Sequence, residues 1–197
     1  MEQTNTPKKG CILVSKPLIN DGFFEQSVVY LTTHDAEGSL GFTLNKVSSL
    51  IAQDFIYEFS GRDTIFYGGP VEQDALFYLH GYDKLPGAMD VGNSLYLGGD
   101  FELFKVLYAE QKKLSMPLPQ PKFFLGYSGW SPGQLEEELK SDTWIILEPP
   151  FNIDPLSASS DAWRTVMKQM GGKYALWANA PSDPLLNERA PKTFNLR

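Results

Sequence analysis

The clearest candidate for nucleophilic chemistry is the segment Gly126-Tyr127-Ser128-Gly129-Trp130. It lies between a strand-like run and a helix-like run, which is the setting of the nucleophile elbow, a sharp turn that exposes a serine. That motif is Gly-x-Ser-x-Gly, and Trp130 stands where its second glycine belongs. A serine nucleophile also needs a base, for which the chain offers His34 and His80. A hydrolase that uses Ser128 with His80 is therefore the alternative hypothesis. The main interpretation is that the glycines form a turn in which Ser128 bonds the local backbone.

The two histidines could also bind a ligand or a metal ion. His80 ends a strand-like run after a glycine-rich turn, where it could act as a general base or as a donor in a pocket. The simpler interpretation is a structural histidine whose ring nitrogens bond the backbone. We expect His34 to be exposed in a polar hairpin loop. Neither histidine has the short spacing to another ligand that metal sites use, so we expect no metal ion and no other cofactor.

A glycine-rich run from Gly92 to Asp100 precedes a predicted helix and resembles an anion-binding helix start. It matches neither the dinucleotide-binding motif nor the P-loop motif. The carboxylate of Asp100 would repel a phosphate at this position. We therefore expect Asp100 to cap the helix through its side chain.

Short β-branched and aromatic runs, separated by glycines, predict the strands that position these residues. The runs are Cys11–Ser15, Ser27–Thr33, Leu40–Asn45, Ile65–Tyr67, Leu76–His80, Ser94–Leu97, Lys122–Tyr127 and Trp144–Leu147. Apolar periodicity and capping residues predict helices from about Asp100 to Leu114, after the N-cap Ser131, from Trp163 to Met170 and, more briefly, near Ser49–Tyr57. In the helix after Ser131, Pro132 takes the first position, and Glu136 can pair with Lys140 across one turn.

The order of these elements is not the regular alternation of a doubly wound fold. We predict an α/β protein of the α+β type: a single domain with a curled mixed β-sheet of about eight short strands, packed with three to four helices. Residues 1–9 are expected to form a flexible arm, residues 10–178 the domain, and residues 179–197 a proline-containing tail.

Composition excludes several classes of protein. The chain has 197 residues, 42% of them apolar, which supplies a core and excludes a disordered chain. The single cysteine, Cys11, excludes an intrachain disulfide. No secretory signal and no apolar run long enough to span a bilayer is present, so we expect a cytoplasmic protein without a membrane partner. The net charge of −7 weighs against direct binding to nucleic acid, which depends on Lys and Arg.

Several ordered blocks occur along the chain: Phe23-Phe24-x-x-Ser27-Val28-Val29-Tyr30-Leu31-x-x-His34-x-x-x-Gly38-x-x-Gly41-x-x-x-Asn45, Gly68-Gly69-Pro70-Val71, Leu79-His80, Gly98-Gly99-Asp100 and Gly126-Tyr127-Ser128-Gly129-Trp130-x-x-Gly133-Gln134-Leu135-x-x-Glu138. Together these blocks resemble the AlgH/YqgE family of bacterial proteins. The resemblance covers about residues 10–176 and implies one α/β domain with a curled mixed sheet. The family is largely uncharacterised, and its name comes from a proposed role in regulating alginate synthesis.

The main functional hypothesis is a non-catalytic binding or regulatory protein. It would act through a small molecule or a protein partner rather than by binding DNA directly. Because the turns of the recognised blocks would line the pocket, the candidate ligand-binding residues are His34, Asn45, Gly68, Gly69, His80, Ser128 and Trp130.

Overall fold

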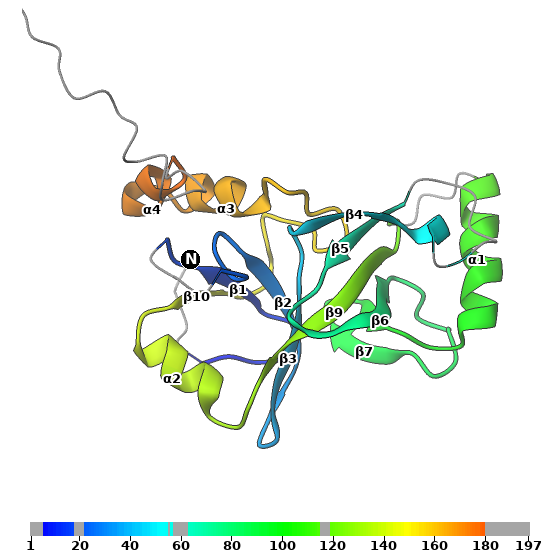
Figure 1. Ribbon diagram of the computed structural model, residues 1–197, viewed down its shortest axis with the longest axis horizontal. Coiled ribbons are helices and arrows are strands. Elements are labelled where there is room, and N and C mark those ends of the chain that lie inside the picture. The colour runs from blue at the N-terminus through cyan, green and yellow to red at the C-terminus, as the bar shows by residue number, and fades with distance from the viewer. Residues whose placement is uncertain (1–5, 18–21, 55, 57–62, 115–118, 180–197) are drawn as a thin grey trace, which may run out of the picture.

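Strand β9 (Lys122–Trp130) is the centre of the sheet because it pairs with three other strands. Its first residues pair in parallel with β5 (Thr64–Tyr67) and antiparallel with β6 (Val71–His80). Its last residues pair antiparallel with β3 (Gly38–Thr43). The parallel pair makes the sheet mixed, as predicted, and β9 joins its two halves (Figure 1).

The structure is a computed structural model that describes residues 6–17, 22–54, 56, 63–114 and 119–179. Within these residues the main path of the ten-stranded sheet runs β10-β1-β2-β3-β9-β6-β8-β7, and β4 pairs with β5. The remaining strands are β1 (Ile12–Ser15), β2 (Val28–Asp35), β4 (Val47–Ile51), β7 (Met89–Gly92), β8 (Leu95–Leu97) and β10 (Trp144–Leu147). The helices are α1 (Phe101–Leu114), α2 (Gln134–Lys140), α3 (Ala162–Met170) and α4 (Gly172–Trp177).

Helices α2, α3 and α4 lie beside the half of the sheet that contains β1, β2 and β10, whereas α1 lies beside the other half (Figure 1). Helix α3 buries Trp163, whose indole Nε1 donates to the carbonyl oxygen of Ser15 at 2.7 Å. Helix α1 buries Phe104 and Tyr108 against Phe123 of β9. In the described part of the chain, no helix has the length and apolar character needed to cross a membrane.

The predicted curled sheet of the α+β type is confirmed, with differences at particular elements. The expected helix near Ser49–Tyr57 is wrong in its described part, which forms β4 and then a short 3-10 helix at Ala52–Asp54. Two further elements were not expected, β7 and α4. Asp100 does cap α1, because its carboxylate accepts from the backbone N–H of Leu103 at 3.0 Å. Parts of the expected arm (1–5), of the Ser49–Tyr57 helix and of the tail (180–197) lie outside the described residues.

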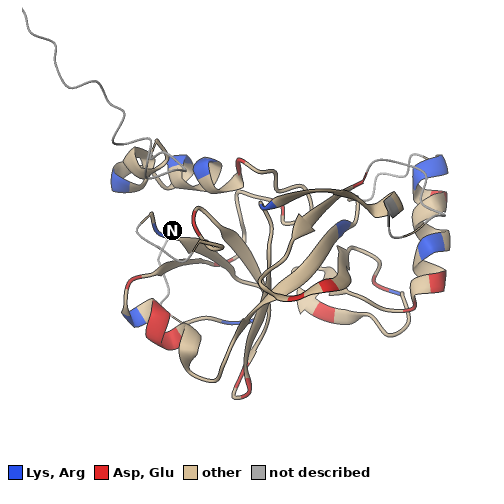
Figure 2. Ribbon diagram, viewed as in Figure 1, with Lys and Arg blue, Asp and Glu red and all other residues tan. Residues whose placement is uncertain are grey.

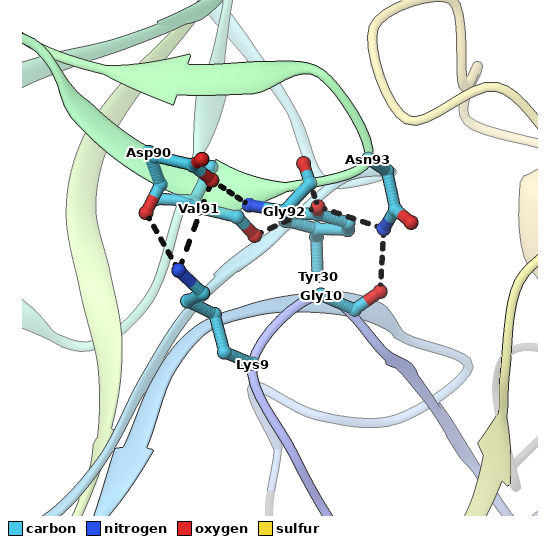
Figure 3. A network of polar contacts seen from close by, with 7 residues as sticks. All are labelled: Lys9, Gly10, Tyr30, Asp90, Val91, Gly92 and Asn93. Atoms are coloured by element: carbon cyan, nitrogen blue, oxygen red, sulfur yellow. Dashed lines mark hydrogen bonds and ion pairs between the residues drawn. The ribbon is translucent and has the colours of Figure 1, made fainter.

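A polar network ties the β7–β8 hairpin to Tyr30 of β2 and to Gly10, which precedes β1 (Figure 3). The hydroxyl of Tyr30 on β2 lies 3.0 Å from the carbonyl oxygens of both Val91 and Gly92, and it accepts from the side-chain amide of Asn93 at 3.1 Å. The same amide donates to the carbonyl oxygen of Gly10 at 2.7 Å. These side-chain contacts connect β2 to β7, although the two strands do not pair with each other in the sheet.

Candidate functional site

Ser128 lies inside the sheet and not on an exposed turn. Strand β9 continues through Trp130, so the turn expected after Tyr127 is wrong. The hydroxyl of Ser128 donates to the carbonyl oxygen of Gly68 at 2.8 Å and lies 3.3 Å from the hydroxyl of Thr43. The residue has no exposed surface. The hydroxyl therefore contributes to the packing of β9 against the end of β5.

Both ring nitrogens of His80 are also hydrogen-bonded to the backbone. Its Nε2 lies 2.8 Å from the carbonyl oxygen of Gly98, and its Nδ1 accepts from the backbone N–H of Tyr82 at 3.1 Å. These two bonds require a neutral ring with the proton on Nε2. Burial lowers the pKa of His80, which favours the same neutral form.

The structure does not bring Ser128 and His80 together. Val71 pairs with Tyr127 beside Ser128, whereas Leu79 pairs with Lys122 at the other end of β9. The six residue steps from Lys122 to Ser128 correspond to about 20 Å of strand. The structure therefore contradicts the alternative hypothesis of a catalytic pair formed by Ser128 and His80, because neither side chain can reach the other.

Contacts within the fold explain the positions of Gly68, Gly69 and Asn45. A Cβ atom on Gly68 would lie 2.3 Å from the carbonyl oxygen of Gly126, and one on Gly69 would lie 2.0 Å from the carbonyl group of Tyr127. The side chain of Asn45 accepts from the N–H of Val28 at 2.9 Å and donates to the carbonyl oxygen of Gln26 at 2.8 Å. The glycines thus permit close crossing of strands, and Asn45 joins the end of β3 to the start of β2.

Trp130 packs in a cluster below α2. Its ring stacks on Phe24 and meets Trp144 edge to face, and the residue is 5% exposed. Its indole Nε1 donates to the carboxylate of Glu138 at 2.9 Å. Helix α2 begins after the N-cap Gly133, two residues beyond Ser131, so the expected N-cap is wrong. The side-chain oxygen of Gln134 accepts from the N–H of Ser131 at 3.0 Å, a capping contact at the start of α2.

His34 lines an open space beside α2. It lies within β2 and not in the loop, with a side chain 18% exposed, so the expected exposed loop position is wrong. Its Nδ1 lies 2.8 Å from the hydroxyl of Ser39, and its Nε2 lies 3.5 Å from a carboxylate oxygen of Glu136 on α2. The space, which we call the hairpin–helix hollow, measures about 360 Å³ and is lined by Thr6, Pro7, His34, Glu136, Leu139 and Lys140.

A second, more open depression lies at the tip of the β2–β3 hairpin. This sheet groove is lined by Thr33, Asp35, Glu37, Gly38, Ser39, Leu40, Val71, Tyr127, Gly129, Trp130, Ser131 and Pro132. Its charged residues are the exposed Asp35 and Glu37, and no Lys or Arg lines it. Figure 2 shows acidic residues at this hairpin tip, whereas α3 and α4 carry basic residues.

Sequence reasoning missed the helix residues of the hollow. Glu136 was expected to pair with Lys140, but among the described ion pairs it approaches His34 instead. The signal was present, because Glu136 lies in the helix that directly follows β9, the neighbour of β3. His34 and Glu136 could contribute two ligands to a cation, and no group of three or more His, Cys, Asp or Glu side chains suited to a metal ion occurs among the described residues.

Comparison with known proteins gives the family. The AlgH-like family model matches residues 12–175. A UPF0301 protein of Cytophaga hutchinsonii is 40% identical over 182 residues, which cover 91% of this chain and 98% of that protein. One from Bacteroides thetaiotaomicron is 37% identical over 183 residues, or 92% of each chain.

Two solved structures share the fold. A crystal structure of a protein from Corynebacterium diphtheriae has a TM-score of 0.73 at 22% identity and covers 91% of this chain and 95% of its own. The solution structure of AlgH from Pseudomonas aeruginosa has a TM-score of 0.62 at 24% identity and covers 98% of this chain and 100% of its own. These two structures show the fold alone. The family model and the relatives above 30% identity show that the chain belongs to the AlgH-like family, whose function is uncharacterised.

Proposed function

We propose that this protein is a cytoplasmic, non-catalytic binding or regulatory protein whose ligand occupies the hairpin–helix hollow. The observation that carries the proposal is the position of His34. His34 lines the hollow, with its imidazole Nε2 3.5 Å from the carboxylate of Glu136. The side chains of Asn45, His80 and Ser128 are instead buried and hydrogen-bonded within the protein. A volume of about 360 Å³ suits a small molecule.

The state of Ser128 and His80 supports binding over hydrolysis. A serine nucleophile must reach both its base and the substrate. Ser128 is buried and bonded to Gly68, and His80 uses both ring nitrogens on the backbone.

Binding of a protein partner at the sheet groove is the second candidate function. The two carboxylates of the groove favour it. None of the ion pairs within the described residues includes Asp35 or Glu37, so a basic segment of a partner would complement them. The same carboxylates would repel the phosphates of DNA, which supports regulation without direct contact with nucleic acid.

The test is a thermal-shift screen of the protein against a library of metabolites and nucleotides, with short duplex DNA included. A ligand at about 100 times its dissociation constant adds about 2.7 kcal/mol, which raises the midpoint by roughly 5–10 °C. We expect a hit that disappears in His34→Ala and Glu136→Gln but persists in Glu137→Gln, the control on the same helix. A ligand that shifts the midpoint equally in all variants would bind outside the hollow.

A further inference from the structure

The ionisable groups of the hairpin–helix hollow have a fixed spacing along α2. Lys140 follows Glu136 by four residues, so the two lie on one face of the helix and about 6 Å apart along its axis. The hollow therefore presents a carboxylate and an ammonium group side by side. His34 stands across from the carboxylate, on β2.

Neither charge is neutralised by the other. Glu136 and Lys140 form no ion pair in the described part of the chain, although they have the spacing of a helical pair. The contact of Glu136 with His34 is 3.5 Å, longer than the 2.7–2.9 Å of a strong charge-assisted hydrogen bond. A carboxylate offers about four acceptor positions, so Glu136 retains capacity for a ligand's donor. Lys140 is exposed and can donate to an anionic group.

The remaining walls are mostly apolar. Leu139 lies between the two charged residues in the sequence of α2, and Pro7 and Thr6 line the hollow from the N-terminal segment. A short carbon chain would contact Leu139 and Pro7, while its polar ends reach the charges.

We propose that the hairpin–helix hollow binds a small zwitterion, in which an ammonium group and a carboxylate are separated by a short carbon chain of about four to six atoms. This inference rests on the proposed function and names the ligand class of the same site. Glu136 accepts from the ammonium group and Lys140 donates to the carboxylate. Glu136 repels a purely anionic ligand such as a phosphate, and Lys140 repels a purely cationic ligand.

Isothermal titration of the full chain with 5-aminopentanoate, pentanoate and pentylamine tests the inference. We expect the amino acid to bind at least tenfold more tightly than either compound with a single charge. Glu136→Gln and Lys140→Gln should each reduce its affinity at least tenfold, whereas Glu137→Gln should not change it. Amide chemical shifts of Leu139 should move on binding, which places the ligand in the hollow.

Equal binding of the three compounds, no binding of 5-aminopentanoate, or unchanged affinity in both variants would overturn the inference. The proposed function is judged separately by the thermal-shift screen. A hit of another chemical class whose binding depends on His34 would support the hairpin–helix hollow as the binding site but would contradict a zwitterion as its ligand. If no ligand in either experiment depends on His34 and Glu136, both proposals fail.

Discussion

Trp130 and Trp144 donate their indole N–H groups to the same carboxylate oxygen of Glu138, at 2.9 and 2.7 Å. The two tryptophans come from β9 and β10, and Glu138 lies on α2 between them in the chain. Both rings are about 95% buried, so water cannot easily replace this acceptor. The shared oxygen therefore fixes the position of α2, and with it the helix wall of the hairpin–helix hollow.

Replacing Glu138 by Ala should destabilise the protein because it leaves two buried indole donors without their acceptor. We expect a loss of about 3 kcal/mol in the free energy of unfolding and a fall of roughly 6–12 °C in the melting midpoint. Thermal denaturation followed by circular dichroism measures this change. Glu137→Ala, at an exposed position on the same helix, is the control and should cost less than about 0.5 kcal/mol. Equal stability of the two variants would contradict the role of Glu138.

Replacing Gly69 by Ala should cost more than about 4 kcal/mol, because the new Cβ would lie 2.0 Å from backbone atoms of Tyr127. Strand backbone cannot move aside as a flexible side chain can. Gly81→Ala is the matched control, since nothing lies within 4 Å of its Cβ position. Urea denaturation of both variants gives the comparison. If Gly69→Ala unfolds within about 1 kcal/mol of the control, close packing does not explain the glycine, and a role in ligand binding regains support.

Local signals in the sequence predicted most elements but not how the chain crosses itself. Asp100 was identified as a cap because an N-cap depends on residues three positions apart. Strand β7 was missed because its four residues, Met89–Gly92, lack an apolar run and are stabilised by distant partners such as Tyr30. The segment around Ser128 has the glycines of a turn, yet it continues as strand, and a Cβ atom on Gly126 would lie 2.5 Å from the carbonyl oxygen of Val71 on β6.

The candidate site was predicted in part for the same reason. His34 could be named from its position in a recognised block. The hollow that it faces also requires α2 and Thr6–Pro7, which are far from it in the sequence, and no local pattern reports that proximity. Asn45, Gly68 and His80 were named from the same blocks, but their contacts are internal.

Replacing Tyr30 by Phe should weaken the junction between β2 and the β7–β8 hairpin. Burial raises the pKa of Tyr30 to about 12, so its hydroxyl stays protonated and available as a donor at neutral pH. Its removal leaves the carbonyl oxygens of Val91 and Gly92 without this donor, which should cost about 1–3 kcal/mol. Hydrogen exchange should then accelerate in β7 before it does in β9. Tyr67→Phe, at a residue that is 37% exposed, is the control and should leave both stability and exchange unchanged. Uniform acceleration in every strand would argue against a local junction.

Lys122 should make stability depend on pH above neutrality. The residue is 3% exposed; its ammonium group lies 3.7 Å from the ring centre of Phe66 and donates to the carbonyl oxygen of Ala158. Burial lowers the pKa of Lys122 to about 7, opposed in part by Asp154. Between pH 7 and about 10.5 the unfolded chain therefore binds a proton that the folded chain does not, so stability rises with pH in this window and the penalty is complete below pH 7.

The measurement is the free energy of unfolding in urea at pH 7 and pH 9, for the wild type and for Lys122→Met. Because Met does not titrate, the stability of the wild type relative to this variant should rise by about 2 kcal/mol between the two pH values. Taking the difference cancels the titration of other groups, including Cys11, whose thiol pKa is raised by burial. Lys113→Met, at an exposed position on α1, should show no such dependence. A difference that stays constant with pH would mean that Lys122 keeps its proton in the folded state, with the ring of Phe66 and the carboxylate of Asp154 sufficient to offset its burial.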